Sequence, residues 1–569
     1  MGKCYTGRME RREAKMREAR RLLWLLVLTV GTCAVLGGTF GQRVRADADT
    51  GSAPDEAVGN NLDAFAKVYS VVEANYADAV SPDRAILGAD GAGLGAIPGM
   101  LGTLDPHSNF LDAKTFARFT ETQEGKYYGV GMRILTVPGK MGKWTTTVIE
   151  PMTGSPALRA GLRPGDVIQK IDGKPVDGLD GDTVAKMLKG PRGTLVHVTV
   201  SREGYDQPLE FNLRRAEITG MSVDDYFFIR PGIAYVRIAS FSETTGDELS
   251  AALEKLGEKN IKGLVLDLRG NPGGILQAAV DVADQFLAKH QLIVYHNGRH
   301  SSEERYYARS GDHGDEYPVV VLINHGTASA AEIVTGALQD HDRALVMGAT
   351  SFGKGLVQKV YTLSEGTGLL LTTAHYYTPS GRLIQRNYDN VSLYDYLYAP
   401  EAAATPHTQV HYTDGGREVF GGGGITPDVK AEEPAYSVAE SRLLASTSCP
   451  NFLQCGPFFE FAKTYLGIHK TLPRDFVPDD QAVQDFRDFL SKQGLILSDK
   501  DLQADQAFIK NHLRDVLVGM VYGQDEARHL SVTDDFVVEK AIDALPEAAA
   551  LVTHARKYMA SHTALHPSF

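Results

Sequence analysis

The stretch Val319–Glu332, which reads VVVLINHGTASAAE, decides the fold. Its apolar run Val319–Ile323 predicts a buried strand, and the small-residue turn that follows leads into a predicted helix over Ser329–Gln339. Ser329 stands at the expected N-terminus of this helix, where free backbone N–H groups and the helix dipole favour developing negative charge. The stretch therefore predicts a strand–turn–helix unit that presents a serine at its turn.

The same kind of unit recurs on both sides of this stretch. The predicted strands are Ile233–Ile238, Gly263–Leu268, Val319–Ile323 and Ala344–Met347, and the helices between them are Gly246–Leu256, Ile275–Leu287 and Ser329–Gln339. Strand–turn–helix repeats of this length imply right-handed crossovers and largely parallel strand pairing. Two further strands are expected over residues 356–363 and 369–377. The region is therefore expected to be an α/β core.

Lys354 admits two chemical interpretations. It stands in Gly348–Gly355, which reads GATSFGKG and is nearly a phosphate-binding loop. However, Gly355 replaces the Ser or Thr that would bind Mg²⁺. A β-patterned run follows, instead of the helix whose N-terminus would face the phosphates. A nucleotide-binding enzyme is thus only the third-ranked function, behind a peptidase and a non-catalytic binding protein.

A serine–lysine pair fits more of the sequence. Gln358 follows Lys354 at i+4, which places both side chains on one face of a strand. A lysine acts as a base only when its pKa falls from about 10.4 to about 7–8 through desolvation. An uncharged glutamine is a suitable partner because a carboxylate would raise that pKa. Two plainer roles stay open: Ser329 as an ordinary helix cap, and Lys354 as a solvated loop residue.

Other catalytic arrangements have less support. His296–His300 and His407–His411 have metal-ligand spacing, but neither has Glu at its second position, and both are expected in surface loops. No G-x-S-x-G elbow is present. His107 and His325 stay open as bases only through their nearness in sequence. No metal and no organic cofactor are expected.

Residues 126–204 form a block of short β-patterned runs with two short helices, and the block resembles a PDZ domain. The resemblance rests on the glycine turn before Ile134 and on the stretch Ala160–Ile168, which reads AGLRPGDVI. In PDZ domains such a turn presents N–H groups to a chain-terminal carboxylate, and the next strand pairs with the peptide. The resemblance makes four residues the expected peptide-binding loop: Gly129, Val130, Gly131 and Met132.

The order of motifs over about residues 62–430 resembles the C-terminal (tail-specific) processing peptidases. These motifs are Leu104–Ser108, the PDZ block, Asp267–Gly274, the Ser329 turn, Phe352–Gln358, Thr378–Arg382 and Gly424–Asp428. The resemblance implies a crotonase-like core with Ser329 as nucleophile, Lys354 as general base and Gln358 orienting it. It also implies oxyanion donors at the backbone of Ala330 and Gly274, with Gly273 as the alternative to Gly274.

One departure from the family pattern lies beside the serine. The family turn reads S-A-S-A-S-E, whereas Thr327 and Ala331 replace its outer serines here. Neither substitution falls on the expected nucleophile. The sequence therefore predicts a serine endopeptidase that recognises proteins with exposed, apolar C-termini. The alternative is a non-catalytic relative that binds peptides or other ligands on the same fold.

The N-terminus carries an export signal. Residues 1–21 contain eight Lys or Arg and three Glu, and Leu22–Phe40 is an uncharged, mostly apolar run. This pattern is typical of a signal peptide or a membrane anchor with its basic flank in the cytoplasm. An uncleaved anchor is favoured, which would place the enzyme at the periplasmic face of a bacterial inner membrane. A soluble periplasmic form after cleavage is the alternative.

Composition sets the remaining limits. The chain of 569 residues is long enough for three or four domains, and its net charge of −13 argues against nucleic-acid binding. In an oxidising compartment Cys449 and Cys455 could close a short disulfide loop, with two free thiols as the alternative. Oligomerisation is left open.

The expected fold class is a mixed α/β (α+β) multidomain protein: a crotonase-like core with an inserted PDZ domain, an N-terminal helical segment and a C-terminal helical extension. The expected divisions are a signal or anchor (1–45), a linker (46–61), a helical region (62–125), a PDZ domain (126–204), a peptidase core (205–430, with an insertion at about 385–424) and a helical extension (431–569).

Overall fold

A computed structural model describes most of the chain. The described residues are 56–77, 79–88, 95–138, 144–311, 317–389, 391–398, 409–432, 436–445, 456–469 and 471–563. The chain divides into two compact units, residues 1–86 and 87–569, and each is described by itself. The first unit contains α2 (Glu56–Asn75) and α3 (Pro82–Ile86). Its helical pattern was expected from Leu62 onward, and the apolar side chains Leu62, Phe65 and Val68 of α2 are exposed.

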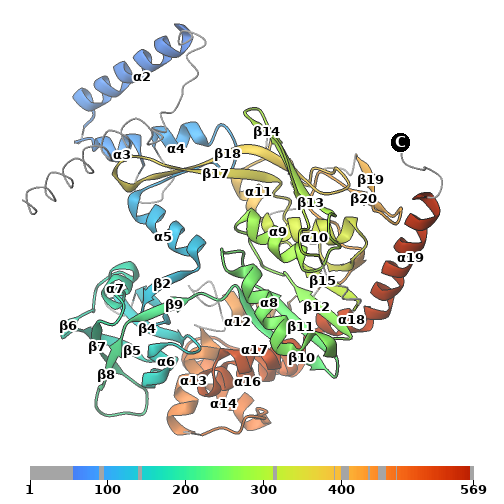
Figure 1. The fold of residues 1–569 in the computed structure, drawn as a ribbon. Helices are drawn as coiled ribbons and strands as arrows, with labels where there is room; N and C mark the ends of the chain where they lie inside the picture. Colours follow the sequence, from blue (N-terminus) through green and yellow to red (C-terminus); the bar gives the residue numbers. More distant parts are fainter. Residues whose placement is uncertain are drawn as a thin grey trace, which may run out of the picture. The chain divides into compact units, whose positions relative to one another are not determined.

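The core of the second unit is a six-stranded sheet in the order β10-β11-β12-β15-β16-β21 (Figure 1). The strands are β10 (Val223–Arg230), β11 (Ile233–Ile238), β12 (Gly263–Asp267), β15 (Val319–Ile323), β16 (Ala344–Gly348) and β21 (Val429–Lys430). All neighbours pair in parallel except β10 with β11, which confirms the predicted parallel core. The central strands β12, β15 and β16 are buried along their whole length, as is usual in parallel sheets.

Helices cover both faces of this sheet. One face packs against α8 (Thr245–Leu256), α9 (Leu276–Asp284) and α10 (Ala330–Asp340), and Leu266, Val321 and Val346 point into that core. The other face packs against α18 (Phe536–Asp543) and α19 (Leu545–Thr563) near the C-terminus (Figure 1). The C-terminal extension therefore completes the core instead of standing apart from it.

A second sheet lies beside the core. Its long strand β18 (Gly368–Tyr377) pairs with β17 (Leu356–Thr362), β1 (Asn109–Leu111) and β13 (Leu292–Gly298), and β14 (Ser301–Tyr307) pairs with β13. The expectation that His296–His300 forms a surface loop is wrong in part: His300 lies in the exposed turn after β13, whereas His296 lies in β13, is 7% exposed and faces Tyr376 of β18 across the strands. The second expected loop is wrong in part, because His411 lies in β19 (Val410–Tyr412), which pairs with β20 (Glu418–Phe420). His407 lies outside the described residues.

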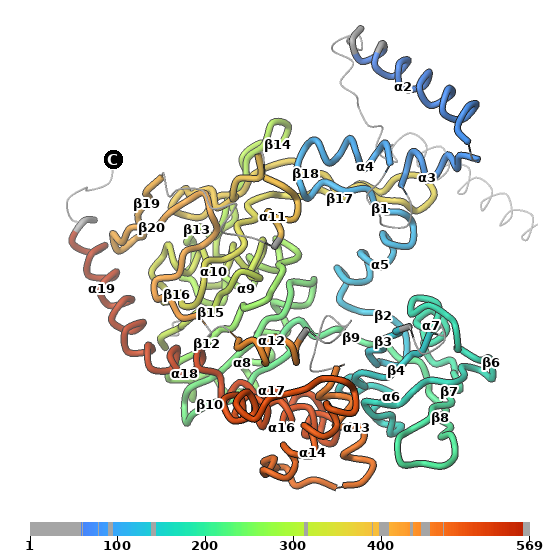
Figure 2. The backbone as a smooth tube through the Cα atoms, turned by 180° about the vertical axis from the view of Figure 1, so that it is seen from behind, coloured from blue at the N-terminus to red at the C-terminus, as the bar shows by residue number. Residues whose placement is uncertain are grey.

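The PDZ block folds as a separate sheet in the order β3-β4-β5-β7-β8, with β6 paired to β5 (Figure 2). These strands are β3 (Met132–Pro138), β4 (Trp144–Pro151), β5 (Val167–Ile171), β6 (Lys174–Pro175), β7 (Leu195–Ser201) and β8 (Leu209–Arg214). The helices α6 (Pro156–Ala160) and α7 (Gly181–Leu188) complete the block. The sheet continues through β8 to Arg214, beyond the expected boundary at residue 204.

Four further elements flank the PDZ block. The helix α4 (Ala96–Leu101) and the longer α5 (Ala113–Glu124) precede the block. The strand β2 (Lys126–Gly129) enters it and pairs with β9 (Ala216–Thr219), where the chain leaves it. The PDZ block is thus inserted between β1 and β10 of the core, as predicted.

The C-terminal helices α12 to α16 form their own apolar core, and α17 follows them. They are α12 (Val438–Ala445), α13 (Pro457–Ile468), α14 (Asp480–Lys492), α15 (Asp499–Ala504), α16 (Gln506–Tyr522) and α17 (Gln524–Thr533). Val483 and Phe486 of α14 meet Leu513 and Leu517 of α16 in this core. Ile149 of β4 belongs to the same cluster, so the helices also pack against the PDZ sheet.

The described part of the chain contains no helix that is long and apolar enough to span a bilayer. The predicted anchor over residues 1–45 and the cysteines Cys449 and Cys455 lie outside the described residues.

Candidate active site

Ser329 lies in the turn after β15, at the carboxyl edge of the parallel core sheet. Its backbone adopts φ 54° and ψ −117°, a conformation that costs free energy for a residue with a side chain. It directly precedes the buried helix α10, so the first free N–H groups of that helix begin beside it. The structure thus places Ser329 where the sequence expected it, in a turn held by its surroundings.

The buried carboxylate of Glu332 organises this turn. Its Oε2 accepts hydrogen bonds from the backbone N–H groups of Ser329 and Lys354, each at 2.8 Å. Its Oε1 accepts from the Ser351 hydroxyl at 2.5 Å and from the Gly353 N–H at 2.7 Å. One side chain therefore joins the serine turn to the lysine loop. Burial raises the pKa of Glu332, although these donors oppose the shift.

Tyr376 of β18 joins the same two segments from another direction. Its hydroxyl lies 3.0 Å from the backbone oxygen of Ser329 and 2.5 Å from that of Lys354. The side chain is 1% exposed, and burial raises its pKa well above the ordinary value. Together, Glu332 and Tyr376 fix the Ser329 and Lys354 backbones against each other.

The Lys354 side chain is held by Gln358. Lys354 Nζ lies 2.7 Å from Gln358 Oε1, and Gln358 Nε2 donates to the backbone oxygen of His107, also at 2.7 Å. This second bond fixes which end of the amide faces the lysine. The predicted contact between Lys354 and Gln358 is present, although Lys354 lies just before β17 and a register shift separates Val357 from Gln358.

Burial lowers the pKa of Lys354 from its ordinary value, and the charges of Asp105 and Glu332 partly oppose this shift. Phe352, two residues before the lysine, belongs to an aromatic cluster. The rings of His107, Phe352 and Tyr396 pack edge to face, with centroids 5.5–6.2 Å apart. Such rings exclude water without supplying a countercharge, which is the environment that favours a neutral amine.

His107 supports this wall from the Leu104–Ser108 turn. Its Nε2 lies 2.9 Å from the hydroxyl of Tyr396, and burial together with the charge of Lys354 lowers the pKa of His107 to about 4. The Asp105 carboxylate fixes the turn by accepting from the N–H groups of His107 and Ser108 at 2.7 and 2.8 Å. His107 is therefore a poor base near neutral pH. His325, the other histidine considered, is exposed.

Two backbone amides lie at the serine turn. A Cβ on Gly273 would lie 2.7 Å from the Ser329 Cβ and 2.8 Å from the Ala330 nitrogen, so this turn touches the serine and admits only glycine. The Gly273 N–H donates to Asn271 Oδ1 at 2.8 Å. No acceptor among the described residues is found for the N–H groups of Gly274 and Ala330. The geometry therefore favours Gly274 over Gly273 as a free donor beside Ala330.

The expected peptide-binding loop lies at the free edge of the PDZ sheet. Gly129, Val130, Gly131 and Met132 are buried, and the carbonyls of Val130 and Gly131 accept from Ala157 and Met152 at 2.9 and 3.0 Å. The strand β3 begins at Met132 and has β4 on one side only. Its other edge is therefore available for an added peptide strand.

Sequence reasoning missed two organising residues. The S-x-x-E spacing from Ser329 to Glu332 is a capping-box pattern and could have pointed to Glu332. Nothing local in the sequence marks Tyr376, because its contacts depend on how β18 crosses the core. Among the described residues no cluster of His, Cys, Asp or Glu is arranged to hold a metal ion.

Comparison with known proteins identifies two domains and several relatives. The chain matches the family descriptions "PDZ domain" over residues 147–202 and "Peptidase family S41" over residues 232–392. A carboxy-terminal-processing protease of Bartonella bacilliformis is 42% identical over 294 residues, which are 51% of this chain and 66% of the relative. A carboxyl-terminal-processing protease of Synechocystis is 40% identical over 291 residues, which are 50% and 66%. The chain thus spans slightly less than two thirds of the length of these two relatives.

A third relative is matched over more of its length. The carboxy-terminal processing protease CtpB of Bacillus subtilis is 33% identical over 346 residues, which are 60% of this chain and 68% of the relative. A solved structure titled as a photosystem II D1 C-terminal processing protease has 30% identity and a TM-score of 0.33, and covers 59% of this chain and 81% of that one. On its domains and its identity to these relatives, the chain belongs to the carboxy-terminal processing proteases of peptidase family S41.

Proposed function

We propose that this protein is a serine endopeptidase that binds protein C-termini through its PDZ domain and hydrolyses a peptide bond with Ser329 and Lys354. The observation that carries the proposal is the buried Lys354 amine, which has a lowered pKa and an uncharged partner, Gln358, at 2.7 Å. A solvated loop lysine would have neither property. The family membership and the Ser329 turn support the same reaction class.

In the proposed reaction Lys354 accepts a proton and returns it, first while the acyl group forms on Ser329 and again while water removes it. Lys354 takes the proton of the Ser329 hydroxyl as its oxygen attacks the substrate carbonyl carbon. The N–H groups of Ala330 and Gly274 then stabilise the negative oxygen of the tetrahedral intermediate. Lys354 returns the proton to the departing amine, which leaves an acyl group on Ser329. Water, deprotonated by Lys354, then releases the new C-terminus and restores the serine.

The test is cleavage by the purified full chain of casein and of a peptide with an apolar C-terminal tail. Ser329→Ala and Lys354→Ala are expected to lose activity, whereas Ser364→Ala and Lys359→Ala, in the same region, should retain it. Undiminished cleavage by Ser329→Ala or Lys354→Ala would contradict the dyad. Peptide binding without turnover by the wild type would favour the non-catalytic alternative, and ATP-dependent cleavage would favour the nucleotide enzyme.

The PDZ assignment has a separate test. The resemblance and the free edge of β3 support recognition of a chain terminus by Gly129–Met132. The peptide with a free C-terminal carboxylate is expected to have a lower KM than the same peptide with an amidated end. Equal KM values for the two peptides would contradict recognition through this loop.

We also propose export to the periplasmic face of a bacterial inner membrane, with the apolar run Leu22–Phe40 as signal or anchor. Membrane fractionation of the full chain, compared with a chain beginning at residue 46, tests this proposal. Non-reducing peptide mapping would test the predicted disulfide between Cys449 and Cys455. Sedimentation of the same preparation would give the oligomeric state.

A further inference from the structure

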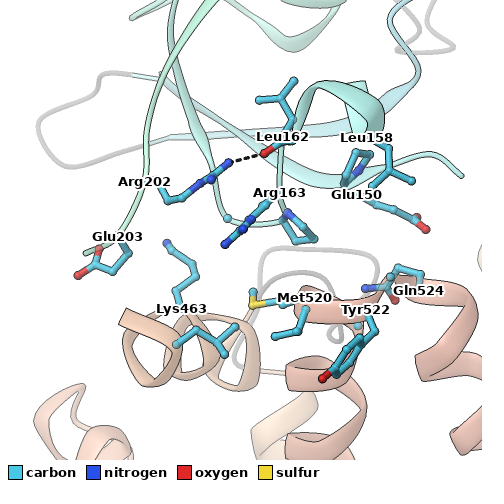
Figure 3. A pocket seen from close by; sticks show the side chains of 18 of the residues that line it. Glu150, Leu158, Leu162, Arg163, Arg202, Glu203, Lys463, Met520, Tyr522 and Gln524 are labelled. Carbon is cyan, nitrogen blue, oxygen red and sulfur yellow. Dashed lines mark hydrogen bonds between the residues drawn. The ribbon is translucent and has the colours of Figure 1, made fainter. Parts of the chain in front are cut away.

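A cavity of about 610 Å³ lies between the PDZ block and the C-terminal helices (Figure 3). On the PDZ side it is lined by the ends of β4 and α6, the turn after α6 and the loop after β7. On the other side it is lined by α13, the end of α16 and the start of α17. None of the described lining residues belongs to the Ser329, Lys354 or Gly274 segments. The cavity is therefore a feature separate from the candidate active site.

Two cationic side chains line this cavity, Arg163 from the PDZ side and Lys463 from the helical side. Arg163 is exposed, and no described carboxylate pairs with its guanidinium. Among the described residues Lys463 forms an ion pair only with Glu460, at 2.9 Å, and the Glu460 side chain is 54% exposed, so water screens the pair. Figure 3 shows the Arg163 and Lys463 side chains pointing into the space between the two domains. An anion placed there would meet two long cationic side chains.

The third cation, Arg202, is a fixed part of the wall. Its Nε and Nη2 donate to the two oxygens of the buried Asp166 at 2.6 and 2.8 Å, and Nη2 also donates to the Gly161 backbone oxygen at 2.8 Å. Asp166 and Arg202 therefore neutralise each other. The cationic groups left to meet a ligand are therefore those of Arg163 and Lys463.

Two of the three carboxylates in the described lining are paired with arginines outside it. Glu150 is paired with Arg133, and Asp525 is paired with Arg528. The third, Glu203, lies at the side of the cavity in Figure 3, and its carboxylate is directed away from Arg163. The guanidinium of Arg163 is therefore not paired with any of these three carboxylates.

The rest of the cavity is mostly apolar. Leu158 and Leu162 contribute from the PDZ side, and Leu466, Met520 and Tyr522 contribute from the helices. Leu158 is 41% exposed although it belongs to this lining. Cavities of this size, with apolar walls and a few convergent polar groups, are typical of small-molecule sites.

An added peptide strand does not suit this cavity. The lining residues Glu150 and Pro151 belong to β4, and their strand partners Arg133 and Met132 already face them on β3. The edge strands of the described sheet are β3 and β8, and neither contributes a described lining residue. The occupant should therefore be recognised by its charge and its apolar body, without main-chain pairing.

We propose that this cavity is a second ligand site, which takes a free monocarboxylate with an extended apolar chain. Arg163 and Lys463 pair with the carboxylate, and the chain lies along Leu158, Leu466 and Met520. Because the two walls belong to different domains, the ligand stabilises the contact of the PDZ block with the C-terminal helices. The site does not depend on peptide hydrolysis.

Calorimetric titration of the full chain with decanoate, below its micellar concentration, tests the site. We expect one site per chain, and a Kd that rises about tenfold or more in Arg163→Gln and in Lys463→Gln through loss of a charge-assisted contact. The exposed Lys170, which is not part of the lining, supplies a matched control: Lys170→Gln should bind as the wild type does. Decanoate should also raise the Tm of the wild type and of Ser329→Ala equally.

Three results would overturn the proposal. Equal binding of uncharged 1-decanol would mean that the carboxylate is not recognised. Unchanged binding in both Arg163→Gln and Lys463→Gln would place the ligand elsewhere. A leucine-terminated peptide whose affinity also falls in Arg163→Gln would make a chain terminus, and not a free acid, the natural occupant. Failure of peptide cleavage would leave all of these measurements interpretable.

Discussion

Lys354 Nζ lies 2.7 Å from Gln358 Oε1, and the amide nitrogen of Gln358 is committed to the His107 backbone oxygen. The lysine is therefore held by a neutral oxygen whose direction is set from a third segment. A carboxylate in its place would stabilise the protonated lysine. Gln358→Glu is expected to move the rising limb of the pH profile of kcat/KM upward by about 1–3 units.

The exposed neighbour Lys359 supplies the control for this prediction, since Lys359→Gln changes the charge by the same amount without touching Lys354. Its pH profile should match that of the wild type. A Gln358→Glu enzyme with reduced activity but an unshifted profile would mean that Gln358 has no influence on the lysine pKa.

Glu332 carries a second prediction, because one carboxylate accepts from Ser329, Ser351, Gly353 and Lys354. In Glu332→Gln an amide N–H₂ would face two of these donors. The free energy of unfolding should fall by about 1–3 kcal/mol. Displacement of the serine turn from the lysine loop should lower kcat by about 100-fold with little change in KM.

Glu303→Gln is the matched control for Glu332→Gln. The Glu303 side chain is 43% exposed and pairs with Arg305 on the surface. Urea denaturation and steady-state kinetics are measured on both variants. If Glu332→Gln were destabilised yet kept its kcat, Glu332 would serve folding alone and not the geometry of the site.

The parts of the site that the sequence predicted are local or depend on regular periods. The β15–turn–α10 unit follows from one buried run and one small-residue turn. The i+4 spacing predicts the Lys354–Gln358 contact, although Lys354 lies before β17 and a register shift precedes Gln358. The role of Tyr376 could not be predicted in this way. Its contacts with the backbones of Ser329 and Lys354 depend on the path of β18 between β1, β13 and β17, and such long-range pairing leaves no periodic signal.

Long-range pairing and packing also explain why the sequence did not predict the β13–β14 hairpin or the role of the C-terminal helices. Residues 292–307 carry Asn297 and Gly298, which suggest a loop, but both lie at the end of β13, and the tight turn to β14 consists of Arg299 and His300. The apolar faces of the C-terminal helices were visible as helical periods. The elements against which these faces pack could not be predicted. A helical period indicates that a face is buried, but it does not identify the element that covers the face.

The packing of α19 on the core sheet carries a third prediction. Leu545 is 6% exposed and belongs to the cluster with Val265 and Val320, and its Cδ1 lies 2.8 Å from where a Cβ on Gly263 would stand. Leu545→Ala should therefore lower the free energy of unfolding by about 2–5 kcal/mol. Leu195→Ala removes the same atoms from a side chain that is 58% exposed. This control should change the free energy of unfolding by about 0.5 kcal/mol or less. Equal unfolding curves for the two variants would mean that α19 does not stabilise the core.

The buried His107 makes stability depend on pH in a defined direction. Burial lowers its folded pKa from 6.5 to about 4, so between these values the unfolded chain binds one more proton than the folded protein. The stability contribution of His107 is therefore complete above pH 6.5 and is lost as the pH falls toward 4, by about 3 kcal/mol in total. His107→Gln removes the titrating group and keeps a polar side chain beside Tyr396. Urea unfolding of both proteins from pH 4 to 7.5 should give a difference in unfolding free energy that shrinks or reverses as the pH falls. A difference that stays constant across this range would show that His107 titrates alike in the folded and unfolded chains.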